Sequence, residues 1–491
     1  MKQKQKILIV GAGEAGRMLL SEYDRRGRSS SVIGFVDDDK SKIDSVIEDK
    51  RVFNTIDNID VVIKEYSINQ AIIAIPSADS TVVNRIVSDI ISTDFDVNIY
   101  IVPSVERYFD RVPLFPSLSD LALGDLLGRD EYLIDVDLIQ DKFKGRTVLI
   151  TGAGGSIGSE ICKQILKFDI DKLIAIGKGE HSIYTLAKSL NEYISFMKNK
   201  PEIIYRIADV RDNNLMGRIF KKYNPHIVFH AAAHKHVPLM EFNELEAVQN
   251  NVLGTLNILD LSSKYGVNEF VQISTDKAVN PLSIMGATKR LAELITDYYN
   301  IKKDLKTAVV RFGNVIGSRG SVVPLFKEQI EKGGPVTVTD PEIKRYFMSI
   351  QEASILVINA AALSGGGEIY VLDMGKQYKV VDVAKKLIEL YGYVPDKDIK
   401  IEFTGLRPGE KLYEELFYDK ENLLKTENEK IFVLNRDKII NTKIEKFIKK
   451  ENKKIARYSS NEIRKMLKDL IGEYDFSDFS KADYSESKIV N

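Results

Sequence analysis

Two glycine-rich segments constrain the fold of this 491-residue chain more than any other feature. The first, "KILIVGAGEAG" (6–16), is an apolar run followed by Gly11, Gly13 and Gly16 and then by a helical pattern. The second, "RTVLITGAGGSIGSEI" (146–161), repeats this order of elements. Glycines between a strand and a helix allow a tight turn and let the helix N-terminus approach a phosphate. Two such openings roughly 140 residues apart predict an α/β chain with two doubly wound parallel sheets in tandem.

The first unit is predicted to be a Rossmann-like nucleotide-binding domain over residues 1–104. The segment "SVIGFVDDD" (31–39) reads as its second strand and places Asp37 about twenty residues after Gly16, where an acid can hydrogen-bond a ribose. Further apolar runs, "AIIAIP" and "VNIYIVP", extend the sheet to the end of the unit. Because nothing near these glycines is reactive, we expect the unit to keep the fold without a catalytic cofactor.

Three further segments follow. Prolines and a lack of periodicity predict a linker over 105–145, then a catalytic domain over 146–435 whose C-terminal part binds substrate, and a helical tail over 436–491. In the tail region, "NLLKTENEKIFVL" (422–434) predicts one strand. The segment "SSNEIRKMLKDLIGEY" predicts an amphipathic helix capped by Ser460.

Composition excludes several classes of protein. With 70 Lys and Arg against 71 Asp and Glu, the net charge of −1 gives no electrostatic attraction to nucleic acid or anionic lipid. The single Cys162 excludes an internal disulfide and is expected to be a core residue of a protein in a reducing compartment. Because no apolar run approaches the roughly 18 residues of a membrane helix, we expect this chain to be soluble and cytoplasmic.

The second unit shows the pattern of a dinucleotide site. Its next strands are predicted in "KLIAIGK", "IIYRIADV" and "PHIVFHAAA", and Asp209 ends the third strand, where an acid commonly hydrogen-bonds the adenine amino group. Lys178 follows the second strand, where a cation suits a 2′-phosphate, so NADP is favoured over NAD, although the choice stays open. The predicted cofactor-binding residues are Gly152, Gly155, Ser156, Ile157, Gly158, Lys178, Asp209, Val210, Ala231, Ala232 and Lys289.

A second cluster of polar residues follows the strand "FVQI". Thr275, Asp276 and Lys277 come directly after this strand, at the edge where an open α/β sheet binds ligands. The helix that follows places Lys289 one turn after Met285 on the same face. A hydroxyl, an acid and two amines at the rim of a dinucleotide fold predict a catalytic site.

Several motifs of this unit resemble one family. They are "TGAGGSIGSE", "HAAAHKHVPLME", "NNVLGT", "STDKAVNP", "RFGNVIGSRGSVVPLF", "RYFM" and "GLRPGEKLYEEL", which together span 146 to about 430. The chain resembles the nucleotide-sugar 4,6-dehydratases, extended short-chain dehydrogenases in which UDP-N-acetylglucosamine loses water across C5 and C6. The N-terminal unit and the "DLLGR" segment resemble the large membrane-anchored branch of that family, whose transmembrane helices are missing here.

The resemblance implies roles for the polar cluster. Lys277 corresponds to the base at C5, Asp276 to the acid at the C6 oxygen, Thr275 to a hydroxyl near the 4-OH, and Lys289 to the ligand of the nicotinamide ribose. These roles require that the pKa of Lys277 fall and that of Asp276 rise. Desolvation favours both shifts and Lys289 would lower the pKa of Lys277 further, whereas a direct contact between Asp276 and Lys277 would oppose both shifts.

One position departs from the family pattern. Short-chain dehydrogenases carry a tyrosine four residues ahead of the active-site lysine, and this chain has Met285 there. A displaced tyrosine is one alternative, since Tyr298 with Lys302, and Tyr299 with Lys303, repeat the spacing. The sequence context instead favours Thr275, with Asp276 or a water held by Lys289, as the group that removes the 4-OH proton, and slow C4 oxidation would follow.

The resemblance also implies a substrate site. Arg407 and Glu410 correspond to ligands of the UDP pyrophosphate and ribose, Asn314 to a substrate contact, Arg345 to a second phosphate ligand, and Lys235 to a residue facing the sugar or the catalytic carboxylate. Four histidines also lie close together in the sequence. No cysteine or carboxylate pattern completes a tetrahedral set with them, so no metal site is predicted. The four are His226, His230, His234 and His236.

The sequence thus predicts an NAD(P)-dependent UDP-N-acetylglucosamine 4,6-dehydratase for surface-polysaccharide synthesis. By family habit it would be a homo-oligomer. Two alternatives stay open. A UDP-hexosamine epimerase would share the fold but have no use for an Asp–Lys pair beside Thr275. A catalytically silent nucleotide-binding regulator would explain Met285.

Overall fold

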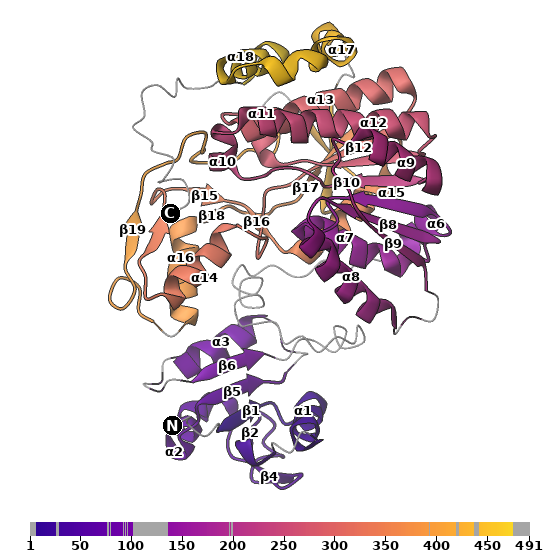
Figure 1. Ribbon diagram of the computed structural model, residues 1–491. Helices are drawn as coiled ribbons and strands as arrows, with labels where there is room; N and C mark the ends of the chain where they lie inside the picture. Colours follow the sequence, from indigo (N-terminus) through magenta and orange to yellow (C-terminus); the bar gives the residue numbers. More distant parts are fainter. Residues whose placement is uncertain are drawn as a thin grey trace. The chain divides into compact units, whose positions relative to one another are not determined.

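The computed structural model describes residues 6–101 and 136–474, apart from gaps at 26–28, 76–77, 79, 92, 94, 96, 196, 198–199, 392, 419–421 and 437–440. These residues divide into two compact units, each of which is treated by itself (Figure 1). The "DLLGR" segment and most of the predicted linker lie outside the described residues.

The N-terminal unit is a six-stranded sheet of order β3-β4-β2-β1-β5-β6. Its pairs are parallel except for the β3–β4 hairpin. The strands are β1 (Ile7–Val10), β2 (Val32–Val36), β3 (Val46–Ile47), β4 (Lys50–Val52), β5 (Gln70–Ile73) and β6 (Asn98–Ile101), and the helices are α1 (Glu14–Arg25), α2 (Ile59–Tyr66) and α3 (Ser80–Ile91). The predicted first Rossmann-like sheet is therefore confirmed.

Hydrogen bonds to the Asp37 carboxylate stabilise the glycine turn of this unit. Gly11 has a φ of +102°, and a Cβ on Gly16 would lie 2.0 Å from the Gly11 carbonyl oxygen, so both positions require glycine. The Asp37 carboxylate accepts hydrogen bonds from the backbone N–H groups of Ala12 at 2.6 Å and Asp39 at 2.8 Å. Lys42 pairs with the same carboxylate at 3.3 Å. Asp37 therefore stabilises the turn in this structure. Its carboxylate is already hydrogen-bonded by the protein, unlike the open carboxylate expected of a ribose-binding acid.

The catalytic unit is built on a nine-stranded sheet of order β20-β21-β17-β12-β11-β10-β7-β8-β9. The seven strands from β17 to β9 run parallel, and β21 and β20 are antiparallel additions at the edge. Their bounds are β7 (Thr147–Thr151), β8 (Lys172–Gly177), β9 (Glu202–Ile207), β10 (Ile227–His230), β11 (Glu269–Ile273), β12 (Lys306–Arg311), β17 (Glu368–Leu372), β20 (Asn422–Lys425) and β21 (Ile431–Asn435).

Helices cover both faces of this sheet, which explains the continuous apolar runs of its strands (Figure 1). In β7, Leu149 packs into one core while Val148 and Ile150 pack into the other. The helices are α6 (Val136–Phe143), α7 (Ser156–Ile165), α8 (Glu180–Ser195), α9 (Asn213–Tyr223), α10 (Val237–Glu241), α11 (Glu244–Ala247), α12 (Gly254–Lys264), α13 (Ile284–Lys303) and α15 (Ile350–Leu363). The predicted second doubly wound sheet is confirmed.

Further short elements lie between and after these strands along the chain. They are β13 (Asn314–Val315), α14 (Val322–Glu331), β14 (Val336–Val338), β15 (Lys344–Arg345), β16 (Phe347–Met348), β18 (Tyr378–Lys379), α16 (Val380–Leu390) and β19 (Ile401–Phe403). Most of them are two or three residues long, so loops carry many of the side chains in this part.

The last predicted segments differ from the structure in three details. Residues 422–435 form the β20–β21 hairpin instead of one strand, because Thr426 Oγ1 donates to the carbonyl oxygen of Ile431 and closes a turn. A helix not predicted from the sequence, α17 (Thr442–Lys449), precedes α18 (Ser460–Ile471). The N-cap of α18 is Ser459, not Ser460, and it forms a capping box with Glu462.

Both ends of the catalytic unit are integrated into its cores. Phe143 of α6, inside the predicted linker, packs against Phe168 and Phe229 with ring centroids 5.4 and 6.4 Å away. The apolar faces of α17 and α18 belong to the same core as α13. Cys162 is fully buried, as expected, and burial raises the pKa of its thiol. Within the described ranges, no helix is both long and apolar enough to cross a membrane.

Candidate active site

The second glycine-rich turn has the shape that a dinucleotide pyrophosphate needs. Gly152 has a φ of +67°, and a Cβ there would lie 2.6 Å from the backbone nitrogen of Ala232 and 2.7 Å from the Ala231 carbonyl oxygen. A Cβ on Gly158 would lie 2.2 Å from the Gly152 carbonyl oxygen. The turn therefore leaves room only for backbone, and it leads into α7 at Ser156, whose N-terminus favours an anion.

The adenosine end of the predicted cofactor site carries charges of both signs. Asp209 pairs with Lys178 at 3.2 Å and with Arg211 at 2.7 Å. The hydrogen bonds from Arg211 lower the pKa of Asp209. Arg211, which was not among the predicted ligands, also pairs with Glu246 at 2.9 Å. Lys178 and Arg211 are thus two cations available to a 2′-phosphate, while Asp209 suits an unphosphorylated ribose or an adenine.

Arg319 is a second residue that the sequence did not single out. It lies in the loop between β13 and α14. Its guanidinium donates to the Gly154 carbonyl oxygen, and its backbone N–H donates to Ser156 Oγ at 3.1 Å. A guanidinium at the glycine turn adds a positive charge to the N-terminus of α7, so the turn and this loop together fit a dinucleotide diphosphate.

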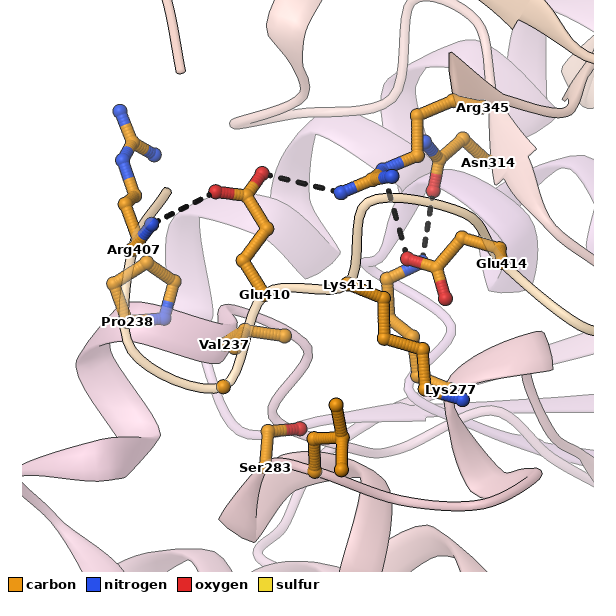
Figure 2. Close-up of a pocket in the computed structure, with 12 residues that line it drawn as sticks. Val237, Pro238, Lys277, Ser283, Asn314, Arg345, Arg407, Glu410, Lys411 and Glu414 are labelled. Atoms are coloured by element: carbon orange, nitrogen blue, oxygen red, sulfur yellow. Dashed lines mark hydrogen bonds and ion pairs between the residues drawn. The ribbon is translucent and has the colours of Figure 1, made fainter. Parts of the chain in front are cut away.

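A pocket of about 530 Å³, counting its open mouth, lies beside the polar cluster (Figure 2). Five of the predicted catalytic and substrate residues line it: Lys277, Asn314, Arg345, Arg407 and Glu410. They come from the 3₁₀ turn after β11, from β13, from β15 and from the 405–416 loop. Thr275, Asp276 and Lys235 are not among the lining residues.

Lys277 is held by three acceptors. Its Nζ lies 3.1 Å from Asp276 Oδ1, 3.1 Å from Asn314 Oδ1 and 3.2 Å from Glu414 Oε1. Burial alone would lower the pKa of Lys277, but the charges of Asp276 and Glu414 outweigh it and hold the pKa above its ordinary value. The expected fall in the pKa of Lys277 is therefore wrong in this structure. The like charge that acts on Lys277 comes from Arg345, not from Lys289.

Asp276 is fully buried behind Lys277. Its Oδ1 accepts from Thr275 Oγ1 at 2.8 Å as well as from Lys277, while its Oδ2 is buried and has no hydrogen-bond partner among the described residues. Burial, with the negative charge of Glu414, raises the pKa of Asp276 against the effect of Lys277. The expected direction for this acid is confirmed, and a protonated Asp276 can donate a proton.

Arg345 of the pocket is paired with two acids of the protein. Arg345 lies between two carboxylates, with Nη2 3.2 Å from Glu410 Oε1 and Nε 3.5 Å from Glu414 Oε1 (Figure 2). Glu410 also accepts from the backbone N–H of Arg407 at 3.1 Å. Glu410 thus orients the Arg345 guanidinium and fixes the backbone at Arg407, and a diphosphate that bound to Arg345 would compete with these carboxylates.

Met285 and Lys289 lie on α13 beside the polar cluster. The Met285 side chain is 2% exposed and belongs to the core under the sheet. Lys289 Nζ donates to the Ile273 carbonyl oxygen at 2.6 Å, and burial lowers the pKa of Lys289 to about 8. Lys289 in turn helps burial lower the pKa of His230 to about 3. The expectation that Lys289 lowers nearby pKa values is thus confirmed for His230.

The displaced-tyrosine alternative has no support in the structure. Tyr299 is 14 residues beyond Met285 on the same helix, about 21 Å along its axis. Its hydroxyl donates to Asp260, and burial raises its pKa. Tyr298 is 6% exposed and packs in the same core. Neither tyrosine lines the pocket.

Lys235 and the histidines have structural partners. Lys235 Nζ donates to Ser318 Oγ at 3.3 Å instead of meeting Asp276, and burial lowers its pKa. His226 accepts from the backbone of Thr147, while His230 lies between Thr151 Oγ1 and Thr255 Oγ1. His234 pairs with Glu246, and the His236 ring packs against Gly320. In the residues that the structure describes, no three metal-ligating side chains converge.

Comparison with known proteins extends these observations. The family model described as "Polysaccharide biosynthesis protein" matches residues 148–436, and the model described as "CoA-binding domain" matches residues 1–103. The chain belongs to the polysaccharide biosynthesis protein family. Its match covers both the glycine turn and the pocket, so the resemblance inferred from the motifs is confirmed.

Relatives within this family carry different names. The capsular polysaccharide biosynthesis protein CapD of Staphylococcus aureus is 46% identical over 448 residues, 90% of this chain and 74% of that protein. A UDP-glucose 4-epimerase of Rickettsia bellii (strain OSU 85-389) is 36% identical, covering 57% of this chain and 80% of that protein. The UDP-N-acetylglucosamine 4,6-dehydratase (inverting) of Campylobacter jejuni is 33% identical, covering 60% and 84%.

A solved structure also resembles the catalytic unit. Pen from Bacillus thuringiensis superposes with a TM-score of 0.54 at 34% identity, covering 60% of this chain and 88% of that chain.

Proposed function

We propose that this protein is a UDP-N-acetylglucosamine 4,6-dehydratase that uses tightly bound NADP or NAD and forms a UDP-4-keto-6-deoxy-N-acetylhexosamine for polysaccharide synthesis. The observation that carries the proposal is the contact of Lys277 with two buried carboxylates, Asp276 and Glu414, at the wall of a pocket that also contains Arg345 and Arg407. The two arginines suit a nucleoside diphosphate. An amine beside buried acids suits a proton abstraction coupled to loss of water.

The residues would act in order. When bound, the nicotinamide would accept a hydride from C4 of the sugar and later return it to C6. Thr275 would take the proton of the 4-OH and pass its own hydroxyl proton to Asp276, to which it is hydrogen-bonded. Lys277 would then take the proton at C5, which the 4-keto group acidifies. Asp276, whose pKa is raised by burial, would protonate the departing C6 hydroxyl. Lys289 would bind the nicotinamide ribose.

This order requires a movement. Asp276 is fully buried and does not line the pocket in this structure. Lys277 must therefore shift before the C6 hydroxyl of the sugar can reach the Asp276 carboxyl group. Lys277 also has to lose a proton to act as a base. The same side chain must therefore both move and be deprotonated. We further propose that the reaction takes place in the cytoplasm and that the chain forms a homo-oligomer.

The test is NMR of the purified protein with UDP-N-acetylglucosamine in D2O. The expected product is a 4-keto-6-deoxy sugar with deuterium at C5, and the couplings at C5 report retention or inversion. The named relative from Rickettsia bellii favours a second candidate, an epimerase, which would instead give the C4 epimer with C5 unlabelled. An unchanged sugar would favour the silent regulator.

A further inference from the structure

The surroundings of Lys277 raise a question about its proton. An ammonium group has three N–H donors, and Lys277 has three acceptors within 3.2 Å: Asp276, Asn314 and Glu414. All three donors are therefore used, and the resting side chain is a fully satisfied ammonium. A base needs a lone pair on Nζ. One of these three acceptor groups must therefore take a proton from Lys277 before Lys277 can act as the base.

The three acceptors are not equivalent as proton carriers. The amide oxygen of Asn314 is too weak a base to take a proton from an amine. Asp276 must already carry a proton if it is to protonate the C6 hydroxyl, and it cannot hold a second one. Glu414 is the remaining acceptor, 3.2 Å from Nζ and with a side chain that is 2% exposed.

Glu414 also has room for a proton. Its Oε2 is buried and accepts no hydrogen bond from the described residues, as is also true of Asp276 Oδ2. A buried carboxylate oxygen without a donor is unfavourable, whereas a carboxylic acid there is neutral. In a site that is closed to water, a neutral amine beside a neutral acid becomes more favourable relative to the ion pair.

Arg345 links this proton to substrate binding. The Nε of Arg345 lies 3.5 Å from Glu414 Oε1. Burial alone would raise the pKa of Glu414, but the positive charges of Lys277 and Arg345 outweigh it and favour the ionised carboxylate. A diphosphate bound to Arg345 would neutralise that charge. Arg345 is a close partner of Glu414, so the loss of its charge would make Glu414 more basic when the substrate arrives.

We propose that Glu414 is the proton acceptor that converts Lys277 from an ammonium into the base of the reaction when a nucleoside-diphosphate sugar binds. One N–H bond of Lys277 breaks, its electron pair stays on Nζ, and an O–H bond forms on Glu414. Nζ then takes the C5 proton while Asp276 releases its proton to the departing C6 hydroxyl as water. After Lys277 returns a proton to C5, the Glu414 proton goes back to Nζ. This role rests on the proposed dehydration and acts through Lys277.

Glu414→Gln tests the role, because glutamine keeps the size and the oxygen that faces Lys277 but cannot take a proton. The matched control is Glu415→Gln, since Glu415 is the next residue and its side chain is 44% exposed. We expect dehydration in Glu414→Gln to fall about 100-fold. We expect KM to change less than threefold and reduced cofactor to accumulate at 340 nm, since C4 oxidation precedes the step. The rate should rise steeply with pH as solvent hydroxide replaces Glu414.

Several outcomes separate the possibilities. If Glu414 merely keeps Lys277 charged, Glu414→Gln would dehydrate as fast as wild type or faster, and the inference would be overturned. Glu414→Asp keeps an acid and should retain at least a tenth of the wild-type rate; an equal loss in both variants, without the pH response, would indicate a structural role and also overturn it. If the wild-type protein forms no dehydrated product, the proposed function itself fails.

Discussion

The buried ion pair of Glu293 with Arg311 lies beneath the catalytic strand. Its removal should lower the free energy of unfolding of the catalytic unit. Both side chains are 0% exposed, with Arg311 Nη2 2.7 Å from Glu293 Oε2. Ser274, which precedes the catalytic cluster, donates to Glu293 Oε1 at 2.6 Å. Glu293→Gln keeps the shape and removes the charge, so the buried guanidinium groups of Arg311 and Arg290 both lose the negative charge with which they pair.

Two estimates of the cost agree. Burial alone would raise the pKa of Glu293, but Arg311 and the neighbouring donors lower it from 4.5 to about 2, which corresponds to about 3 kcal/mol of stability at neutral pH. Breaking a buried ion pair by removing one partner typically costs about 3–5 kcal/mol. We therefore expect Glu293→Gln to lower the free energy of unfolding of the catalytic unit by about 3 kcal/mol.

Urea unfolding at pH 7, followed by circular dichroism, measures this loss. The matched control is Glu445→Gln on α17, which removes a surface pair with Lys449 and should leave the free energy of unfolding nearly unchanged. The pH dependence gives a second check. A carboxyl group with a lowered pKa stabilises the fold above its unfolded pKa, so the difference between wild type and variant should be constant from pH 7 to about 5 and shrink below about 4.5. A loss under about 1 kcal/mol would refute the reasoning.

Three further predictions concern the active site. Burial lowers the pKa of Lys289 to about 8, so cofactor affinity, measured by fluorescence titration, should weaken as pH rises through about 8 in wild type but stay level in Lys289→Met. Arg319→Ala should weaken NAD(P) binding roughly tenfold and release cofactor on dialysis, whereas the exposed Arg218→Ala on α9 should not. Met285→Tyr should lower the free energy of unfolding by about 1–3 kcal/mol, since position 285 is buried. The Met285→Tyr variant should nevertheless oxidise C4 of the sugar faster than Met285→Phe, which controls for size. Equal rates in the two variants would exclude proton transfer as the slow step.

The elements of the two sheets could be predicted because their signals are local. A strand buried on both faces reads as an apolar run, and a turn with positive φ, such as that at Gly152, demands glycine wherever it occurs. The same holds for Thr275, Asp276 and Lys277 at the rim of the sheet, since they follow the predicted strand "FVQI". The hairpin of 422–435 was missed because its turn depends on a side-chain hydrogen bond of Thr426.

The protonation of the site was decided by packing. The motif "RPGEKLYEEL" contains three glutamates, and its letters do not distinguish the exposed Glu415 from Glu410, which pairs with Arg345, or from Glu414, which contacts Lys277. Arg319 likewise gave no signal, because its contact with Gly154 joins segments far apart in the sequence. The sequence by itself determined two glycine turns, two sheets and the catalytic strand, since each depends on neighbouring residues. Only the tertiary structure decided which carboxylates meet Lys277, because the electrostatic energy of a buried charge depends on distances that packing alone sets.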